Sequence, residues 1–181
     1  MTDLTMRDLA ATGSFDGAGK RTMPKRSRAE QAVAAAIFVA ATVAVAAIGS
    51  VVNNAAMDWY DTLEQPSIAP PGPTFGIVWT VLYVMIAVSG WLAWRATTRS
   101  APTVTWAVQM ALNLAWTAVF FGLESIGGGL FVIGTLFVAI VVSALVARQV
   151  SRPAALLLVP YIAWVAFAAA LNAAYAFENF A

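Results

Sequence analysis

The chain has 181 residues, of which 61% are apolar and 10% are charged, and its formal net charge is +1. Soluble domains carry about 25% charged residues, so composition excludes a soluble fold, and the small net charge gives no sign of a nucleic-acid partner. The chain contains no cysteine and no histidine. This absence excludes disulfides, thiolate nucleophiles, the usual zinc sites and a Ser-His triad, so we predict neither catalytic nor metal-binding residues.

The first 30 residues differ in kind from the rest. They are rich in Gly, Ser, Thr, Asp and basic residues and show no apolar stripe of helical period. We predict a disordered cytoplasmic tail over residues 1–30. Its basic cluster from Lys20 to Arg28 either binds anionic lipid or only sets the topology of the chain.

Five long apolar blocks follow residue 30, and each can cross the roughly 30 Å hydrocarbon core that about 20 helical residues span. They run approximately over residues 31–52, 74–94, 102–123, 127–147 and 154–177. The links after the second, third and fourth blocks are short, which forces neighbouring helices to run antiparallel. We therefore predict an all-α fold, an integral membrane bundle of five transmembrane helices over residues 31–181.

Charge divides the two ends of this predicted bundle. All ten Lys and Arg residues precede the first block or lie in the links after the second and fourth blocks, which share one side of the membrane. The charged residues of the opposite connections are all acidic: Asp58, Asp61, Glu64 and Glu124. By the positive-inside rule the N-terminus is cytoplasmic and the C-terminus faces outward. We expect a multi-pass protein of the bacterial cytoplasmic (inner) membrane. No ionisable residue lies at mid-depth, which argues against ion-coupled transport.

The connection from Asn53 to Pro73, between the first two blocks, is longer than simple linkage needs. Long loops in compact domains are usually functional or disordered. This loop combines apolar anchors with rigid backbone: Trp59, Tyr60, Leu63 and Ile68 with Pro66, Pro70, Pro71 and Pro73. Such a mixture favours a fixed cover over the outer end of the bundle.

Tryptophan occurs in two settings. Trp79, Trp116 and Trp164 lie well inside their blocks, where they form either a flat wall for a planar ligand or ordinary helix packing. Three others flank the basic link between the second and third blocks: Trp91, Trp94 and Trp106. We interpret these three as an interfacial aromatic belt.

Polar and small residues within the blocks suggest contacts between helices. Asn113 and Asn172 lie at span depth, where they either bind a ligand or tie helices together, and we interpret Gln109 as a structural tie. Alanine recurs every fourth residue in the third block, at Ala107, Ala111 and Ala115, which suits a homodimer contact. A competing stripe runs along the fifth block: Ala166, Ala170 and Ala174.

The loop and the blocks also contain a series of different short motifs. The loop and second block contain Trp59-Tyr60-Asp61, Leu63, Pro66-Ser67, Pro70-Pro71, Phe75, Trp79-Thr80 and Leu82-Tyr83. The third block contains Leu112-Asn113, Ala115-Trp116 and Phe120-Phe121-Gly122, and the fifth contains Pro160-Tyr161, Ala163-Trp164, Ala166-Phe167-Ala168 and Leu171-Asn172. In this order, over roughly residues 50 to 175, the motifs resemble those of the translocator protein family, also called tryptophan-rich sensory proteins or peripheral-type benzodiazepine receptors.

The resemblance implies a five-helix bundle, frequently a homodimer, with a ligand cavity between the helices near the end that the first loop covers. It implies porphyrins such as protoporphyrin IX as ligands, sterols in some members, and no required cofactor. We expect the ligand site to comprise Trp59, Tyr60, Pro70, Pro71, Trp79, Tyr83, Asn113, Trp116, Trp164, Ala168, Leu171 and Asn172.

The chain departs from the family pattern at Ile68, where members commonly have an aromatic residue shortly before the double proline. The resemblance implicates that aromatic residue, together with the tryptophan matched by Trp164, in the light-driven degradation of protoporphyrin IX by bacterial members. An isoleucine cannot stack on a porphyrin or form an indole radical, so we do not expect this enzymatic activity. No basic residue follows Tyr175, so a cholesterol-recognition motif is incomplete.

Taken together, these features predict a membrane protein that binds porphyrins (protoporphyrin IX, haem-like tetrapyrroles) or similar flat apolar ligands. The binding would serve transport, sequestration or sensing. Two alternatives stay open: an enzyme that degrades porphyrin with light and oxygen, and a structural or partner-binding membrane protein without a small-molecule ligand. The expected partners are the ligand, the lipid bilayer and a second copy of the chain.

Overall fold

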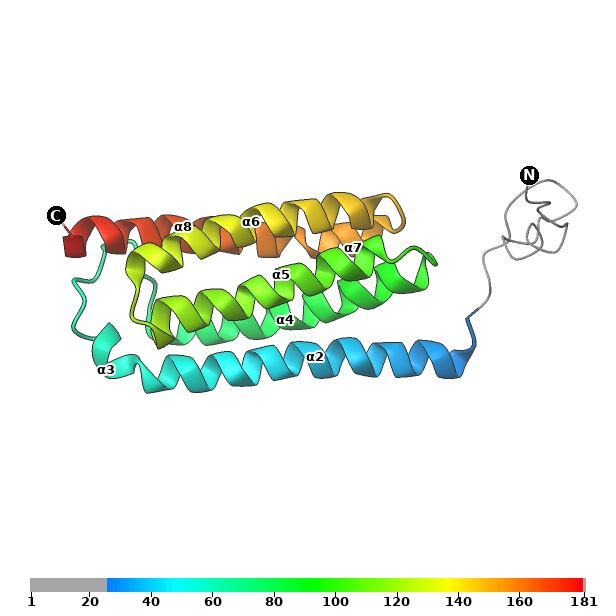
Figure 1. The fold of residues 1–181 in the computed structure, drawn as a ribbon, viewed down its shortest axis with the longest axis horizontal. Helices are drawn as coiled ribbons and strands as arrows, with labels where there is room; N and C mark the ends of the chain where they lie inside the picture. Colours follow the sequence, from blue (N-terminus) through cyan, green and yellow to red (C-terminus); the bar gives the residue numbers. More distant parts are fainter. Residues whose placement is uncertain (1–25, 181) are drawn as a thin grey trace, which may run out of the picture.

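The structure, a computed structural model, describes residues 26 to 180 (Figure 1). The elements in this part of the chain are all helical: α2 (Arg28–Ala55), α3 (Met57–Tyr60), α4 (Gly72–Arg95), α5 (Ala101–Thr117), η1 (Ala118–Gly122), α6 (Ile126–Arg148), α7 (Arg152–Leu157) and α8 (Val159–Phe180). Five segments are long and apolar enough to cross a membrane: Arg28–Ala55, Gly72–Arg95, Ala101–Gly122, Ile126–Arg148 and Arg152–Phe180. The predicted five-helix membrane bundle is confirmed. Most of the tail predicted for residues 1–30 lies outside the described residues, and α2 already begins at Arg28.

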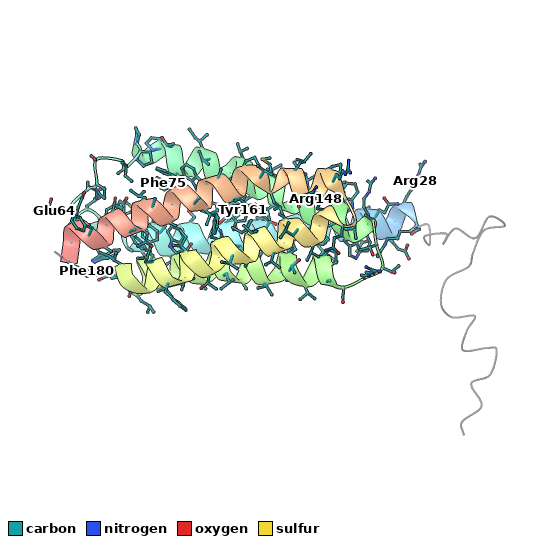
Figure 2. All side chains as sticks on the ribbon, turned by 90° about the horizontal axis from the view of Figure 1, so that it is seen from above. Arg28, Glu64, Phe75, Arg148, Tyr161 and Phe180 are labelled. Atoms are coloured by element: carbon teal, nitrogen blue, oxygen red, sulfur yellow. The ribbon has the colours of Figure 1, made fainter. Side chains whose placement is uncertain are left out.

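The long helices lie side by side along one axis (Figure 1). α6 packs against both α5 and α8, while α2 packs against α4 and α5. One end of the bundle holds the start of α2 and the α4–α5 and α6–α7 links, and the other holds α3, the following loop and the end of α8. Arg28 and Arg148 mark the first end, here called the basic end, and Glu64 and Phe180 mark the second, the loop end (Figure 2).

Short polar caps and prolines set where the helices begin and break. Ser27 caps α2 in a capping box, in which the Glu30 N–H donates to Ser27 Oγ at 3.1 Å and the Ser27 N–H donates to Glu30 Oε2 at 2.7 Å. The fifth span is divided at Leu158, just before Pro160. A proline has no N–H to donate to the carbonyl four residues earlier, which accounts for the separation of α7 from α8.

Apolar side chains both fill the interior and cover the outside. Ile86, Leu136 and Val165 are fully buried at the centre of the bundle. Ile37 and Phe131 by contrast are 62% and 76% exposed. An apolar outer surface of this kind is unfavourable in water but matches lipid acyl chains. The backbone is also compatible with lipid, because the helices satisfy their own backbone hydrogen bonds. The exposed apolar faces therefore fit an integral membrane protein.

Two of the three tryptophans of the predicted belt do lie at the basic end. The Arg26 guanidinium stacks 3.6 Å from the centroid of the Trp94 ring, and the Trp91 Nε1–H donates to the Gln31 carbonyl at 3.1 Å. Trp106 is different, and the prediction that it belongs to an interfacial belt is wrong. It is only 7% exposed, and its Nε1–H donates to the Ile86 carbonyl at 3.0 Å.

Glycine permits the close packing around Trp106. A Cβ atom at Gly90 would lie 2.6 Å from Trp106 Nε1 and 2.7 Å from Phe38 Cδ1. The rings of Phe38 and Trp106 meet edge to face with centroids 4.7 Å apart. Phe38 comes from α2, Gly90 from α4 and Trp106 from α5, so these three helices are tightly packed toward the basic end.

Candidate functional site

The three helices are not closely packed at the loop end. A cavity of about 460 Å³, here called the chamber, lies there between α2, α3, α4 and the α5–η1 segment. Its wall consists of Ala46, Gly49, Ser50, Asn53, Met57, Tyr60, Gln65, Pro70, Gly72, Phe75, Gly76, Trp79, Thr80, Tyr83, Trp116, Thr117 and Phe121. The volume falls within the roughly 300 to 1,000 Å³ of typical ligand pockets.

Small residues on two facing helices create this space. Along α2, the wall residues Ala46, Gly49, Ser50 and Asn53 follow a helical spacing of three, one and three residues, which places them on one face. Along α4, Gly72 and Gly76 are four residues apart, and a Cβ atom at either glycine would meet nothing within 4 Å. Toward the basic end, α2 and α4 are in close contact at Phe38 and Gly90. At the loop end, the small residues of the same two helices leave the chamber between them.

Aromatic rings form much of the remaining wall, on α4 and on the α5–η1 segment. The Trp79 and Tyr83 rings have centroids 5.4 Å apart and are tilted by 31°. Trp116 stacks on Phe120, with centroids 5.7 Å apart and an interplanar angle of 28°. Such flat, polarizable surfaces favour offset stacking with a planar ligand, worth about 0.5 to 1.5 kcal/mol beyond the burial of area. The chamber therefore suits a flat and largely apolar molecule.

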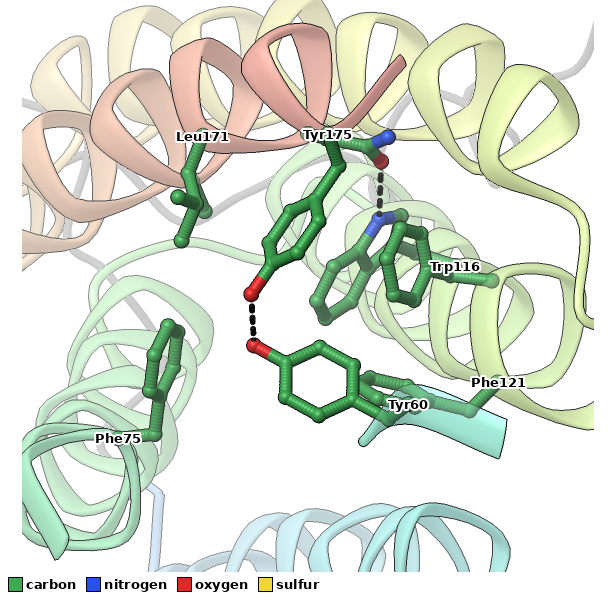
Figure 3. A pocket seen from close by; sticks show the side chains of 9 residues that line it. Tyr60, Phe75, Trp116, Phe121, Leu171 and Tyr175 are labelled. Carbon is green, nitrogen blue, oxygen red and sulfur yellow. Dashed lines mark hydrogen bonds between the residues drawn. The ribbon is translucent and has the colours of Figure 1, made fainter. Parts of the chain in front are cut away.

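A second cavity of only about 30 Å³ lies next to the chamber (Figure 3). Tyr60, Phe75, Trp116 and Phe121 line both spaces. The rest of its wall comes from η1 and α8: Phe120, Ala168, Leu171, Asn172 and Tyr175. A space of this size holds about two waters at most, so it is too small to be a ligand site of its own.

The two asparagines within the spans tie helices together. Asn113 of α5 accepts from the Tyr83 hydroxyl of α4 at 2.9 Å and donates through Nδ2 to the Tyr161 hydroxyl of α8 at 3.1 Å. Asn172 of α8 donates to the Ile126 carbonyl at 3.0 Å and accepts from Trp116 Nε1 at 3.4 Å. These bonds fix Tyr83 and Trp116, so the ties also position two aromatic rings of the chamber wall.

Gln109 does not form the structural tie that the sequence suggested. Its side chain is fully buried on α5, but neither Nε2 nor Oε1 has a hydrogen-bond partner among the described residues. Gln109 lines neither cavity. A buried amide without partners is rare in native proteins, and nothing in the surrounding packing explains this one.

The loop after α3 is attached to the end of α8. The Tyr175 hydroxyl donates to Gln65 Oε1 at 2.6 Å, so its hydrogen bond with Tyr60 uses the Tyr60 hydroxyl as the donor. The Glu64 N–H donates to Asn179 Oδ1 at 2.9 Å, and Asn179 Nδ2 donates back to the Glu64 carbonyl at 3.2 Å. We call these contacts the loop latch. The latch fixes Tyr60 and Gln65 on the chamber wall, as the prediction of a fixed cover requires.

The expected site residues divide into three groups. Tyr60, Pro70, Trp79, Tyr83 and Trp116 line the chamber. Ala168, Leu171 and Asn172 line the small cavity, as do Tyr60 and Trp116. Trp59, Pro71, Asn113 and Trp164 line neither space. More than half of the expected residues thus gather around two adjoining cavities at the loop end.

The four residues outside the cavity walls have other surroundings. Trp59 packs edge to face on Phe120 with centroids 5.7 Å apart, and Pro71 immediately precedes α4. Asn113 makes the interhelical bonds described above. Trp164 packs edge to face on Phe75 with centroids 5.5 Å apart, and its Nε1–H is buried without a partner among the described residues. Trp164 therefore supports the chamber through Phe75, a residue that lines it.

Sequence reasoning missed the contribution of α2 altogether. None of the expected site residues came from the first span, yet one of its faces closes the chamber from Ala46 to Asn53. The available signal was a run of small residues at helical spacing that ends in a polar residue at the end of the span. Alanine and glycine are so frequent in this chain that the run did not stand out.

Comparison with known proteins agrees with this architecture. Residues 37–177 match the model of the TspO/MBR family. This match covers most of the chain. The chain belongs to the TspO/MBR family. Its membership confirms the resemblance found in the loop and span motifs.

Relatives within the family include bacterial and animal proteins. The chain is 39% identical to the tryptophan-rich protein TspO of Chlorobaculum tepidum over 150 residues, which is 79% of this chain and 94% of the relative. It is 33% identical to protein CrtK of Rhodobacter capsulatus over 141 residues, 76% of this chain and 87% of the relative. It is also 36% identical to the human translocator protein over 126 residues, 67% of this chain and 75% of the relative.

Proposed function

We propose that this TspO/MBR family protein binds protoporphyrin IX, or a similar flat apolar tetrapyrrole, in the chamber at the loop end. The binding serves transport, sequestration or sensing of the ligand. The single observation that carries the proposal is the chamber itself, about 460 Å³ in volume and walled by Trp79, Tyr83 and Trp116. The names of relatives support a role in sensing or transport, since one is called a tryptophan-rich sensory protein and others translocator proteins.

The surroundings of the chamber suggest how a ligand is held. Apolar contact supplies most of the affinity, at roughly 25 cal/mol per Å² of buried ligand surface before the costs of association. The loop latch keeps Tyr60 and Gln65 in place over the chamber. On the proposed topology, with the N-terminus in the cytoplasm, the chamber lies toward the outer face of a bacterial inner membrane.

A second copy of the chain is part of the proposal. The alanine stripe of α5 is available for it, because Ala107 and Ala111 are exposed and Ala115 is half-buried. The α8 stripe is exposed at Ala166 and Ala170 and half-buried at Ala174, so it remains the competing surface. Neither stripe lines the chamber, so a dimer through either would leave the ligand site intact.

A titration tests the binding directly. Protoporphyrin IX is added to the purified protein in lipid nanodiscs, and the quenching of tryptophan fluorescence is followed. We expect saturable binding that Trp116→Ala weakens at least tenfold, while Trp91→Phe, at the basic end, leaves it unchanged. If the wild type shows no saturable binding, or if Trp116→Ala binds like the wild type, the proposed site is wrong.

A further inference from the structure

Two tryptophans at the basic end hold arginine side chains on their rings. The Arg26 guanidinium lies 3.6 Å from the centroid of the Trp94 ring, and the Arg95 guanidinium lies 4.7 Å from the centroid of the Trp91 ring. Trp91 and Trp94 are three residues apart in α4, so both rings lie on the same side of the helix. We call these four side chains the Arg–Trp cradle. The cradle brings two positive charges together where α2 begins and α4 ends.

Hydrogen bonds to the surrounding chain fix the cradle. The Trp91 Nε1–H donates to the Gln31 carbonyl at 3.1 Å, which fixes the ring that carries Arg95. Arg26 donates through Nη2 to the Thr97 carbonyl at 2.8 Å. A guanidinium group has five N–H donors, so a ring contact and one hydrogen bond leave most of the donors outside these contacts. The two arginines therefore suit an anion with several oxygen acceptors, such as a phosphate.

Negative charge is scarce around the cradle. Glu30 is the sole acidic residue among the described residues of the basic end, and its carboxylate accepts from the Ser27 N–H at 2.7 Å in the capping box of α2. Arginine is more frequent there, and four others lie at the helix ends and links of this end: Arg28, Arg99, Arg148 and Arg152. The basic end as a whole attracts anions, and the cradle adds two guanidinium groups in fixed positions.

Apolar surface runs from the cradle toward the middle of the bundle. On α4, Val84 and Val88 are exposed, and their spacing to Arg95 places all three residues on one face. On α2, Val33 and Ile37 are exposed as well. Tryptophan is enriched at the level of the lipid headgroups, so the cradle lies at headgroup depth and the exposed aliphatic side chains lie among acyl chains. A molecule that fits both parts has a phosphate group and long hydrocarbon chains.

We propose that the Arg–Trp cradle binds the headgroup phosphate of an anionic phospholipid, whose acyl chains follow the exposed faces of α2 and α4. The inference goes beyond the proposed function, because the cradle lies at the basic end and shares no residue with the chamber. A zwitterionic lipid places its own cation beside the arginines, so an anionic lipid is preferred. A free phosphate makes only the polar half of these contacts.

Native mass spectrometry of the full chain in a mild detergent measures the binding of single lipid molecules. Phosphatidylglycerol is compared with phosphatidylcholine, which has the same acyl chains and no net charge. Arg95→Gln removes one charge of the cradle, and Arg26→Gln removes the other. Arg148→Gln is the matched control, because Arg95 and Arg148 are both exposed and each is the last residue of its helix. Thermal melting without added lipid checks the fold of each variant, and if Arg26→Gln does not fold, Arg95→Gln decides the test.

We expect the wild type to bind phosphatidylglycerol about fivefold more tightly than phosphatidylcholine, or better. Arg95→Gln and Arg26→Gln should each weaken phosphatidylglycerol by about fivefold to tenfold, as expected for one guanidinium–phosphate contact, while Arg148→Gln changes it by less than about twofold. Equal weakening in Arg95→Gln and Arg148→Gln overturns the cradle, since the overall charge would then explain the binding.

Two further results would overturn the proposal. The first is a wild type that does not prefer the anionic lipid. The second is displacement of phosphatidylglycerol by an equal concentration of glycerol 3-phosphate, which has the phosphate without the acyl chains, because a soluble anion would then be sufficient. We expect glycerol 3-phosphate to leave the bound lipid in place.

Discussion

Filling the chamber without disturbing the fold is the sharpest perturbation that the structure offers. Gly76 lies on the chamber wall, and a Cβ atom there would meet nothing within 4 Å. A leucine side chain adds four carbon atoms; if each takes roughly the 30 Å³ that one water molecule occupies in the liquid, Gly76→Leu would fill on the order of 120 Å³ of the space. This is about a quarter of the 460 Å³ available. A flat ligand that needs the full chamber then loses contact with the α4 wall.

The size of the effect follows from the contact that is lost. Displacing a ligand from the area that a buried leucine covers costs about 1.5 to 3 kcal/mol, so affinity should fall by about ten- to a hundredfold. The fold should not suffer, because replacing glycine by leucine within a helix raises helix propensity by somewhat less than about 1 kcal/mol. Gly76→Leu is therefore expected to combine unchanged or higher thermal stability with weak binding.

A second helical glycine provides the control. Gly134 of α6 is exposed, a Cβ atom there also meets nothing within 4 Å, and it does not line the chamber. Both variants are titrated with protoporphyrin IX in nanodiscs, and their melting temperatures are compared in the same detergent. Gly134→Leu should bind like the wild type. Wild-type affinity in Gly76→Leu, or an equal loss of affinity in both variants, would refute the placement of the ligand.

Three further predictions concern packing, the latch and photochemistry. Gly90→Ala should destabilise the bundle by about 1 to 3 kcal/mol, because its Cβ would lie 2.6 Å from Trp106 Nε1. Gly49→Ala should be tolerated, because the nearest atoms would lie 3.8 Å from its Cβ. Thermal unfolding compares the two variants, and equal melting temperatures would contradict the packing around Gly90. Asn179→Ala removes both hydrogen bonds to Glu64. Because the chain has no cysteine, Ser67→Cys can carry a single spin label in the loop, and this label should become more mobile in Asn179→Ala. An unchanged spectrum would show that the latch does not hold the loop. Ile68 is exposed and lines neither cavity, so illuminated protoporphyrin IX should lose absorbance no faster with the wild type than without protein, and faster loss would restore the enzyme alternative.

The fold was predictable because span length and link length are local properties of the sequence. Each span is an apolar block long enough to cross the bilayer, and the short links leave neighbouring helices little choice of direction. The predicted and observed span boundaries agree to within a few residues. The first span, for example, was predicted over residues 31–52 and is observed as Arg28–Ala55. The division of the fifth span at Leu158 was not predicted, although Pro160 gave a local reason for it.

The candidate site was only partly predictable, because a cavity is a property of facing surfaces. The positions of Trp79 and Trp116 within their spans marked them as interior residues, and both line the chamber. The same reasoning failed for Trp106, which lies near a helix end but is buried by Phe38 and by a glycine on a third helix. It also missed Asn53, because no pattern within α2 shows that α4 presents glycines opposite to it.

The most direct test of ligand binding in the chamber is an experimental structure of the protein with protoporphyrin IX bound. Density for the ligand should lie in the chamber between α2 and α4, with the ring system against Trp79 and Trp116. Density outside the bundle beside Trp164, or a chamber closed by movement of α2 onto α4, would contradict this placement.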